Sequence, residues 1–326
     1  MTNGRYVPPS PAEGRSPTLF WLQCGACSGD SMSLLGIHEP DLGELVRDVG
    51  LEILWHPSVS RATPGEFKET VDAIVSGRKR LDVLCVEGSI IRGPGGTGMF
   101  DTFAGSPKKD LAAALARKAE FVVAVGTCAG FGGIPAAGEI EATGLQFDKG
   151  SRGGVLGPQF TARSGLPVIN LPGCPVQPEL ISGALAALLR AESLPLNEFQ
   201  MPLEWYGVLV HQGCTRNEYH EFRVEDHQFG LPGCLFYHLG CQGPMTYGSC
   251  NKMLWSGRTS RTRVGVPCVG CKDPEFPKAQ PFFRTRNIEG VPLDLPVGVD
   301  RAHFLAYKTM AEAVAPERLR NRKQPV

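Results

Sequence analysis

The last third of the chain concentrates side chains that bind soft metals. They are one histidine and six cysteines: His211, Cys214, Cys234, Cys241, Cys250, Cys268 and Cys271. Iron–sulfur clusters are held by cysteine thiolates in short pairs with distant single partners, and histidine sometimes replaces one thiolate. The set exceeds what one metal ion can bind, so it indicates several clusters and therefore a path for electrons.

A different reading of the same residues is a zinc site. The spacing from His211 to Cys214 suits zinc, which takes four nitrogen or sulfur ligands around one ion. A zinc ion on the first four residues would leave Cys250, Cys268 and Cys271 without an evident fourth ligand. Three thiolates suit a [3Fe–4S] cluster, which needs one ligand for each iron. We therefore favour clusters and keep a zinc-stabilised scaffold as the alternative class of protein.

The first half of the chain alternates strand-like and helix-like segments. The expected strands are residues 18–23, 51–56, 81–88, 121–126 and 167–171, and the expected helices are residues 38–49, 65–77, 108–120 and 178–192. Short apolar strands alternating with amphipathic helices indicate a parallel sheet covered by helices on both faces. We predict an α/β, flavodoxin-like doubly wound sheet.

More possible ligands follow the expected strands. Cys24 and Cys27 come after the first strand, Cys128 after the fourth and Cys174 after the fifth. In open α/β sheets ligands bind beyond the carboxyl ends of the strands, so these loops could hold a cluster together. Cys85 lies inside an apolar strand and is expected to be a core thiol.

Glu87 directly follows the third strand. It could handle protons or shape the environment of a cluster, or it could simply accept hydrogen bonds as a cap. The residues alone leave both readings open.

From about residue 200 onward the composition changes to Gly, Pro, Cys and aromatic residues, and only residues 301–314 look helical. Metal binding stabilises such a loop-rich domain because the binding free energy becomes folding free energy. We expect a flavodoxin-like domain over residues 1–195 and a loop-rich iron–sulfur domain over residues 196–326.

Bulk properties exclude several classes of protein. The 33 basic and 33 acidic residues balance, so there is no electrostatic argument for nucleic acid. No apolar run is long enough to span a bilayer. The first residues show neither a twin arginine nor an apolar signal region, so we expect a cytoplasmic protein, either free or attached to a membrane through a partner. Eleven cysteines in a chain of this length and expected compartment favour metal ligands over disulfides.

Six motifs together resemble the small, electron-transferring subunit of [NiFe] hydrogenases. They are VEGSI, GTCAGFGGI, INLPGCPVQP, HQGC, LGCQGPMTYGSC and VPCVGCKDPEFP, and the resemblance runs from Phe20 to Pro277. It implies a medial [3Fe–4S] cluster on Cys250, Cys268 and Cys271, and a distal [4Fe–4S] cluster on His211, Cys214, Cys234 and Cys241. The family has five residues between its two middle distal cysteines, whereas six separate Cys234 from Cys241.

This chain departs further from the family pattern at the residues expected to hold the proximal [4Fe–4S] cluster. In the family, four residues separate a Trp-Leu pair from the first ligand, and two residues separate the first ligand from the second. Counted from Trp21-Leu22, the first ligand position is Cys27 and the second is Asp30. The resemblance therefore implies proximal ligation by Cys27, Asp30, Cys128 and Cys174, with Cys24 adjacent. The competing prediction has Cys24 and Cys27 as the ligands and Asp30 only nearby.

With this altered motif the chain is most similar to the actinobacterial-type, high-affinity hydrogen-uptake branch. The resemblance implies that H2 is oxidised at a Ni–Fe centre in a separate large subunit. Electrons would pass through three clusters to an acceptor, which is expected to be a quinone. The chain would pair with the large subunit, and the pairs would form a larger assembly. A sensory or quinone-reductase-type relative is the alternative within redox proteins.

Overall fold

The computed structural model describes residues 15–38, 40–278 and 282–320. The expectation about an export signal rests mainly on residues 1–14, which lie outside this part. The chain forms two compact units, one of residues up to Glu204 together with Pro274–Phe276, and one of the remaining residues. The change between units comes at Glu204, beyond the expected boundary at residue 195.

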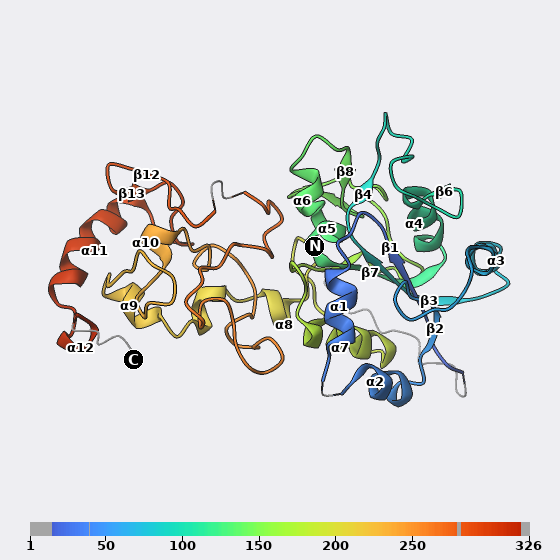
Figure 1. The fold of residues 1–326 in the computed structure, drawn as a ribbon, viewed down its shortest axis with the longest axis horizontal. Coiled ribbons are helices and arrows are strands. Elements are labelled where there is room, and N and C mark those ends of the chain that lie inside the picture. The colour runs from blue at the N-terminus through green and yellow to red at the C-terminus, as the bar shows by residue number, and fades with distance from the viewer. Residues whose placement is uncertain (1–14, 39, 279–281, 321–326) are drawn as a thin grey trace. The chain divides into compact units, whose positions relative to one another are not determined.

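A five-stranded parallel sheet organises the first unit (Figure 1). Its strands are β1 (Thr18–Gln23), β2 (Glu52–Trp55), β3 (Leu81–Glu87), β7 (Ala119–Val125) and β11 (Ile169–Leu171). Their order in the sheet is β11-β7-β3-β1-β2, and every pairing is parallel. This is the flavodoxin-like order, so the predicted fold class is confirmed. All seven residues of the central strand β3 are buried, as expected of a strand covered on both faces.

Helices cover the two faces of this sheet (Figure 1). They are α1 (Gly29–Leu35), α2 (Leu42–Asp48), α3 (Pro64–Val75), α4 (Lys108–Ala116), α5 (Gly126–Phe131), α6 (Gly133–Ala136) and α7 (Pro178–Leu189). Helix α1 packs against α7, and α3 packs against α4. Both α2 and α3 begin with a capping box, in which an Asp or Thr side chain and a Glu side chain satisfy free backbone amides. The sequence did not predict α1 or α5, which occupy two of the expected cysteine loops.

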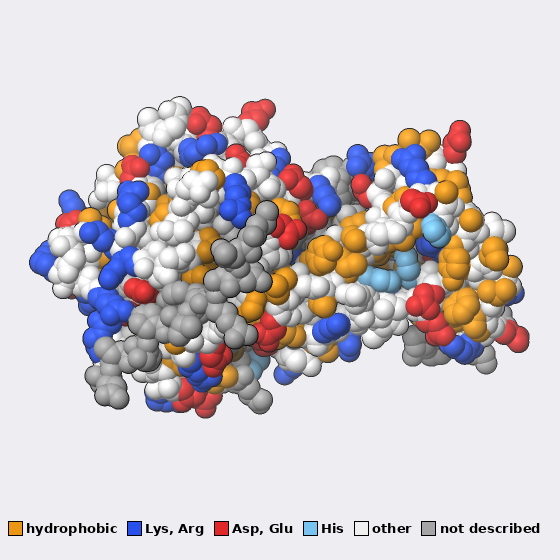
Figure 2. All heavy atoms as spheres, turned by 180° about the vertical axis from the view of Figure 1, so that it is seen from behind, with side chains coloured by type: hydrophobic (Ala, Val, Ile, Leu, Met, Phe, Trp, Pro, Cys, Tyr) orange, Lys and Arg blue, Asp and Glu red, His pale blue; other side chains and the backbone are white. Residues whose placement is uncertain are grey.

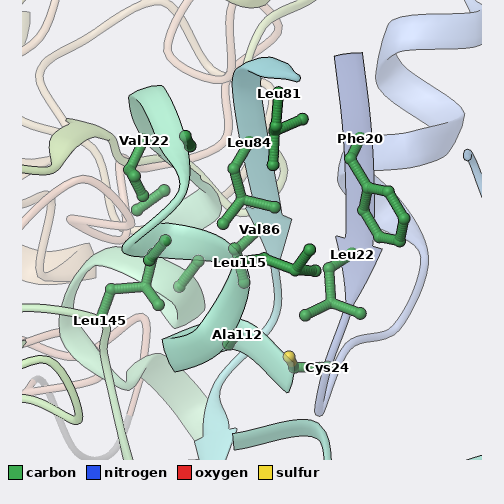
Figure 3. Packing of buried hydrophobic residues seen from close by; sticks show 14 of the residues in the cluster. Phe20, Leu22, Cys24, Leu81, Leu84, Val86, Ala112, Leu115, Val122 and Leu145 are labelled. Atoms are coloured by element: carbon green, nitrogen blue, oxygen red, sulfur yellow. The ribbon is translucent and has the colours of Figure 1, made fainter. Parts of the chain in front are cut away.

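The main core lies between the sheet and α4 (Figure 3). Phe20 and Leu22 of β1 pack there with Leu84 and Val86 of β3 and with Leu115 of α4. The loops of this unit contain short two-residue strands: β4 (Ile90–Ile91), β5 (Thr102–Phe103), β6 (Ser106–Pro107), β8 (Ala142–Thr143), β9 (Phe147–Asp148) and β10 (Ser151–Arg152). The rigid sheet fixes the positions of the loops at its carboxyl edge.

The second unit has little regular structure, as predicted. Its elements are α8 (Leu203–Tyr206, which begins in the first unit), the 3-10 turn η1 (Val210–Gly213), α9 (Asn217–Glu221), α10 (Phe236–Leu239), β12 (Asn287–Ile288), β13 (Val291–Pro292), α11 (Arg301–Ala313) and α12 (Glu317–Arg320). Its core includes Cys234, Cys241 and Cys268 beside Phe236 and Phe304. Sulfur atoms thus take the place that aliphatic side chains hold in an ordinary core.

On the face seen in Figure 2, acidic and basic side chains are interspersed, in keeping with the balanced composition. In the described part of the chain, no helix combines the length and the apolar character needed to cross a bilayer.

Candidate metal centres

The three cysteine loops of the first unit follow β1, β7 and β11 at the carboxyl edge of the sheet. Cys27 and Cys174 are exposed, and Cys128 in α5 is half-buried. A Cβ atom added to Gly29 would lie 3.2 Å from Cys27 Sγ and 3.4 Å from the Pro175 ring. The loop that carries Cys27 and the loop that carries Cys174 therefore touch. The structure brings three of the predicted proximal ligands to one edge.

Asp30 reaches into the same place from the first turn of α1. Its side chain is 8% exposed, and Oδ1 accepts a hydrogen bond from the amide of Val176 at 2.8 Å. A Cβ atom on Gly126, which has φ +91°, would lie only 2.2 Å from Asp30 Oδ2. The carboxylate is held between the loops that carry Cys128 and Cys174.

Burial raises the pKa of Asp30 to about 7, although the Val176 amide opposes this and nearby Glu87 adds to it. A buried carboxylate without a cation nearby is unfavourable when charged. A bound metal would remove that penalty. The donor set of one carboxylate and three thiols therefore fits a proximal cluster.

Cys24 has a different environment. It is 4% exposed and belongs to the hydrophobic core with Leu22 and Ala112 (Figure 3). Burial raises the pKa of its thiol, as it does for the proposed ligand Cys241, so the distinguishing feature of Cys24 is its packing among aliphatic side chains. This geometry favours Asp30 over Cys24 as the fourth proximal ligand. Cys85 is likewise in the core, fully buried.

Glu87, at the end of β3, accepts three hydrogen bonds, one from β1 and two from the start of α1. The donors are Trp21 Nε1 at 3.1 Å, the Asp30 amide at 3.0 Å and the Ser31 hydroxyl. It is 1% exposed. These contacts are those of a cap that holds Asp30 in place, and a proton-handling role stays a prediction.

The four predicted distal ligands line one cavity of the second unit: His211, Cys214, Cys234 and Cys241. Gly240, with φ +64°, ends the short helix α10 and lets the chain turn back toward Cys241. Helix α10 lies within the six residues that separate Cys234 from Cys241. Burial raises the pKa of the Cys241 thiol to about 11, and iron would offset that penalty because a coordinated thiol is deprotonated outright.

The predicted medial ligands lie together next to the distal ones. Thiolate charge on Cys241, Cys271 and Cys250 adds to burial in raising the pKa of Cys268. The amide of Cys268 donates to Cys241 Sγ at 3.3 Å, and the Gly270 amide donates to Cys268 Sγ at 3.4 Å. Amides aimed at sulfur are the usual surroundings of an iron–sulfur cluster. The two ligand groups of this unit are therefore direct neighbours.

In the described residues, no three His, Cys, Asp or Glu side chains converge closely enough to hold a single metal ion. A cluster binds each protein ligand on a separate iron, so its ligands stand further apart than those of one tetrahedral zinc.

Two residues beside the distal site were not predicted. His220 in α9 has Nδ1 3.4 Å from Cys234 Sγ, and its ring lies 4.6 Å from the ring of His211. Burial, with smaller effects from His211 and Arg223, lowers the pKa of His220 to about 3. No spacing rule ties this histidine to a ligand motif, so the sequence carried no signal for it.

Arg216 is the other. Its guanidinium is buried and donates to the carbonyls of Thr262 and Gly233 at 2.6 and 2.5 Å, and to that of Leu231. It holds the segment before Cys234 in place. Its position two residues after Cys214 was the available clue.

Comparison with known proteins identifies the family. Residues 27–188 match the model of the NADH ubiquinone oxidoreductase 20 kDa subunit, and residues 206–284 match the C-terminal model of the NiFe/NiFeSe hydrogenase small subunit. The Hydrogenase-2 small chain of Escherichia coli K12 is 30% identical over 84% of this chain and 71% of its own length. The quinone-reactive Ni/Fe-hydrogenase small chain of Wolinella succinogenes is 29% identical over 79% and 71%.

A solved structure matches the whole chain. It is the actinobacterial-type NiFe-hydrogenase from Ralstonia eutropha H16, with a TM-score of 0.76 and 28% identity over 100% of this chain and 98% of that one. The two family models together cover both units, and the curated relatives span most of the chain. The chain therefore belongs to the family of [NiFe] hydrogenase small subunits.

Proposed function

We propose that this chain relays electrons from H2 oxidation through three iron–sulfur clusters. Cys27, Asp30, Cys128 and Cys174 would hold a proximal [4Fe–4S] cluster; Cys250, Cys268 and Cys271 a medial [3Fe–4S] cluster; and His211, Cys214, Cys234 and Cys241 a distal [4Fe–4S] cluster. When bound, the clusters supply one-electron transfer. The observation that carries the proposal is the hydrogen bond from the Cys268 amide to Cys241 Sγ, because it puts the medial and distal ligand sets in contact.

The carboxyl edge of the sheet is the proposed face for the large subunit, which would carry the Ni–Fe centre. Exposed hydrophobic side chains surround the proximal loops: Met32 on α1 is 65% exposed and Ile134 on α6 is 53% exposed. Exposed Cys27 and Cys174 lie on the same loops. Apolar side chains of this size on a free surface are typical of a protein interface.

A quinone is the proposed acceptor. A cavity of about 550 Å³ in the second unit is lined by Tyr237, His238, Phe304 and Lys308 among others. Figure 2 shows histidine and hydrophobic side chains together at the surface of this unit. Quinone reduction takes two electrons and two protons to give the quinol, and aromatic walls suit its planar ring.

The cavity also touches the distal site. Val224 and Glu225 line it, and the Cys234 amide donates to the carbonyl of Val224 at 3.0 Å. Arg223 also lines the cavity, and its guanidinium carries N–H donors and a positive charge. Such donors suit a quinone oxygen, which becomes negative on reduction. The similarity to the quinone-reactive small chain of Wolinella succinogenes gives independent support.

The test is metal analysis of the complex purified from its native host by a tag on this chain. We expect about one nickel per chain and about eleven iron beyond that of the Ni–Fe site. Iron without nickel would leave the relay but remove the hydrogenase partner. Zinc in place of iron would contradict the whole proposal.

A further inference from the structure

His220 lies at the wall of the distal site without belonging to the predicted ligand set. It sits in α9, which begins three residues after Cys214. Its Nδ1 points at Cys234 Sγ at 3.4 Å. The rings of His211 and Phe236 pack against it edge-on, at 4.6 and 5.6 Å between centroids. The imidazole is thus fixed from two sides.

The direction of this contact follows from the chemistry of the sulfur. A cysteine that binds iron is a thiolate, which has no proton and can only accept a hydrogen bond. The ring nitrogen facing it must then carry the proton. A neutral imidazole meets this requirement as its Nδ1–H tautomer, and a charged imidazole carries a proton on both nitrogens.

A hydrogen bond to a cluster sulfur stabilises the reduced form more than the oxidised form, because reduction adds negative charge to the sulfurs. Hydrogen bonding to sulfur is one of the main influences on the potential of a cluster. Cys234 also pairs through its backbone with Val224 and Asp226, beside the proposed acceptor cavity. Any effect at Cys234 therefore acts on the proposed exit point for electrons.

We infer that His220 is a positioning residue of the distal centre: its Nδ1–H donates to the thiolate of Cys234 and raises the reduction potential of the distal cluster. This inference rests on the proposed three-cluster relay. In this role His220 favours arrival of electrons at the distal cluster and opposes their release to acceptors of low potential. It is not a fifth ligand.

The test is a redox titration of the purified complex in which the EPR signal of the distal cluster is measured at each potential. In His220→Phe the ring is kept and the donor is lost, so the midpoint potential should shift to a lower value at unchanged iron content. In His220→Asn the side-chain amide reaches the position of Nδ1, so the potential should return toward the wild-type value. His303→Phe, at a side chain that is 82% exposed on α11, should leave it unchanged.

Two results would overturn the inference. An unchanged potential in His220→Phe would show that His220 only packs against the site. Loss of iron together with the distal signal would show that it is a ligand. If the variants do not assemble, ENDOR of the wild-type complex with ¹⁵N-labelled histidine decides: we expect one large nitrogen coupling and one small one, and absence of the small coupling refutes the donor. A wild-type complex without a distal signal would instead refute the three-cluster relay.

Discussion

Gly126 offers a direct test of whether the Asp30 carboxylate belongs to the proximal centre. The substitution Gly126→Ala would put a Cβ atom 2.2 Å from Asp30 Oδ2, whereas ordinary contacts begin at 3.4 Å. The carboxylate would have to move by roughly 1 Å, since packed interiors leave little room elsewhere. That movement breaks its 2.8 Å hydrogen bond from the Val176 amide.

The expected cost has two parts. An L-residue with positive φ costs roughly 1–2 kcal/mol, and Gly126 has φ +91°. Loss of a buried hydrogen bond to a charged group costs about 1.5–3 kcal/mol more. Gly77→Ala is the matched control, because Gly77 has φ +81° with nothing within 4 Å of its added Cβ. The control carries the backbone cost alone.

The assays are the thermal transition of the complex, its iron content and the spectrum of the proximal cluster. Gly126→Ala should lower the transition roughly twice as far as Gly77→Ala and should change the proximal spectrum, while Gly77→Ala keeps the wild-type spectrum. If both variants show the wild-type proximal spectrum and full iron, the carboxylate does not contact the cluster and the reasoning is wrong.

Three further predictions concern the same sites. Asp30→Ala should alter the proximal spectrum and Cys24→Ser should not, although a hydroxyl in the apolar core costs about 1–3 kcal/mol of stability. The reverse pattern would favour the competing prediction, in which Cys24 and Cys27 are both ligands. Arg223→Leu removes a donor whose hydrogen bond to a charged acceptor is worth about 1.5–3 kcal/mol, so it should slow H2 oxidation with a soluble naphthoquinone by roughly tenfold. It should leave the rate with a small artificial dye unchanged. Arg258→Leu, at an exposed arginine, should change neither rate. Burial raises the pKa of Glu225 to about 7 from 4.5, so the fold favours the neutral carboxyl: its stabilising effect is full below pH 4.5 and is lost as the pH rises through 7. The melting temperature of the wild-type complex should therefore fall more between pH 5 and 7.5 than that of Glu225→Gln, and equal slopes would show that Glu225 ionises freely.

The contrast between Cys24 and Cys27 shows how a sequence pattern can mislead. The pair looks like a short ligand pair, but Phe20, Leu22 and Cys24 share one buried core. Side chains two apart in a strand point to the same face, so the direction of Cys24 already followed from the strand that precedes it. Asp30 became a candidate only through the resemblance to a family, because a single carboxylate in a glycine-rich loop carries no metal signature of its own.

By itself the sequence determined the types of the proposed ligands, their order along the chain and the parallel sheet, because thiol spacing and apolar periodicity are local properties. Tertiary structure decided which of those groups meet. Three contacts join segments that are separated along the chain. They are the hydrogen bond from the Cys268 amide to Cys241 Sγ, the position of Asp30 between two loops and the approach of His220 to Cys234. Each depends on the path that the backbone takes through the fold. No local pattern encodes that path, since it follows from how the whole core and its buried sulfurs pack.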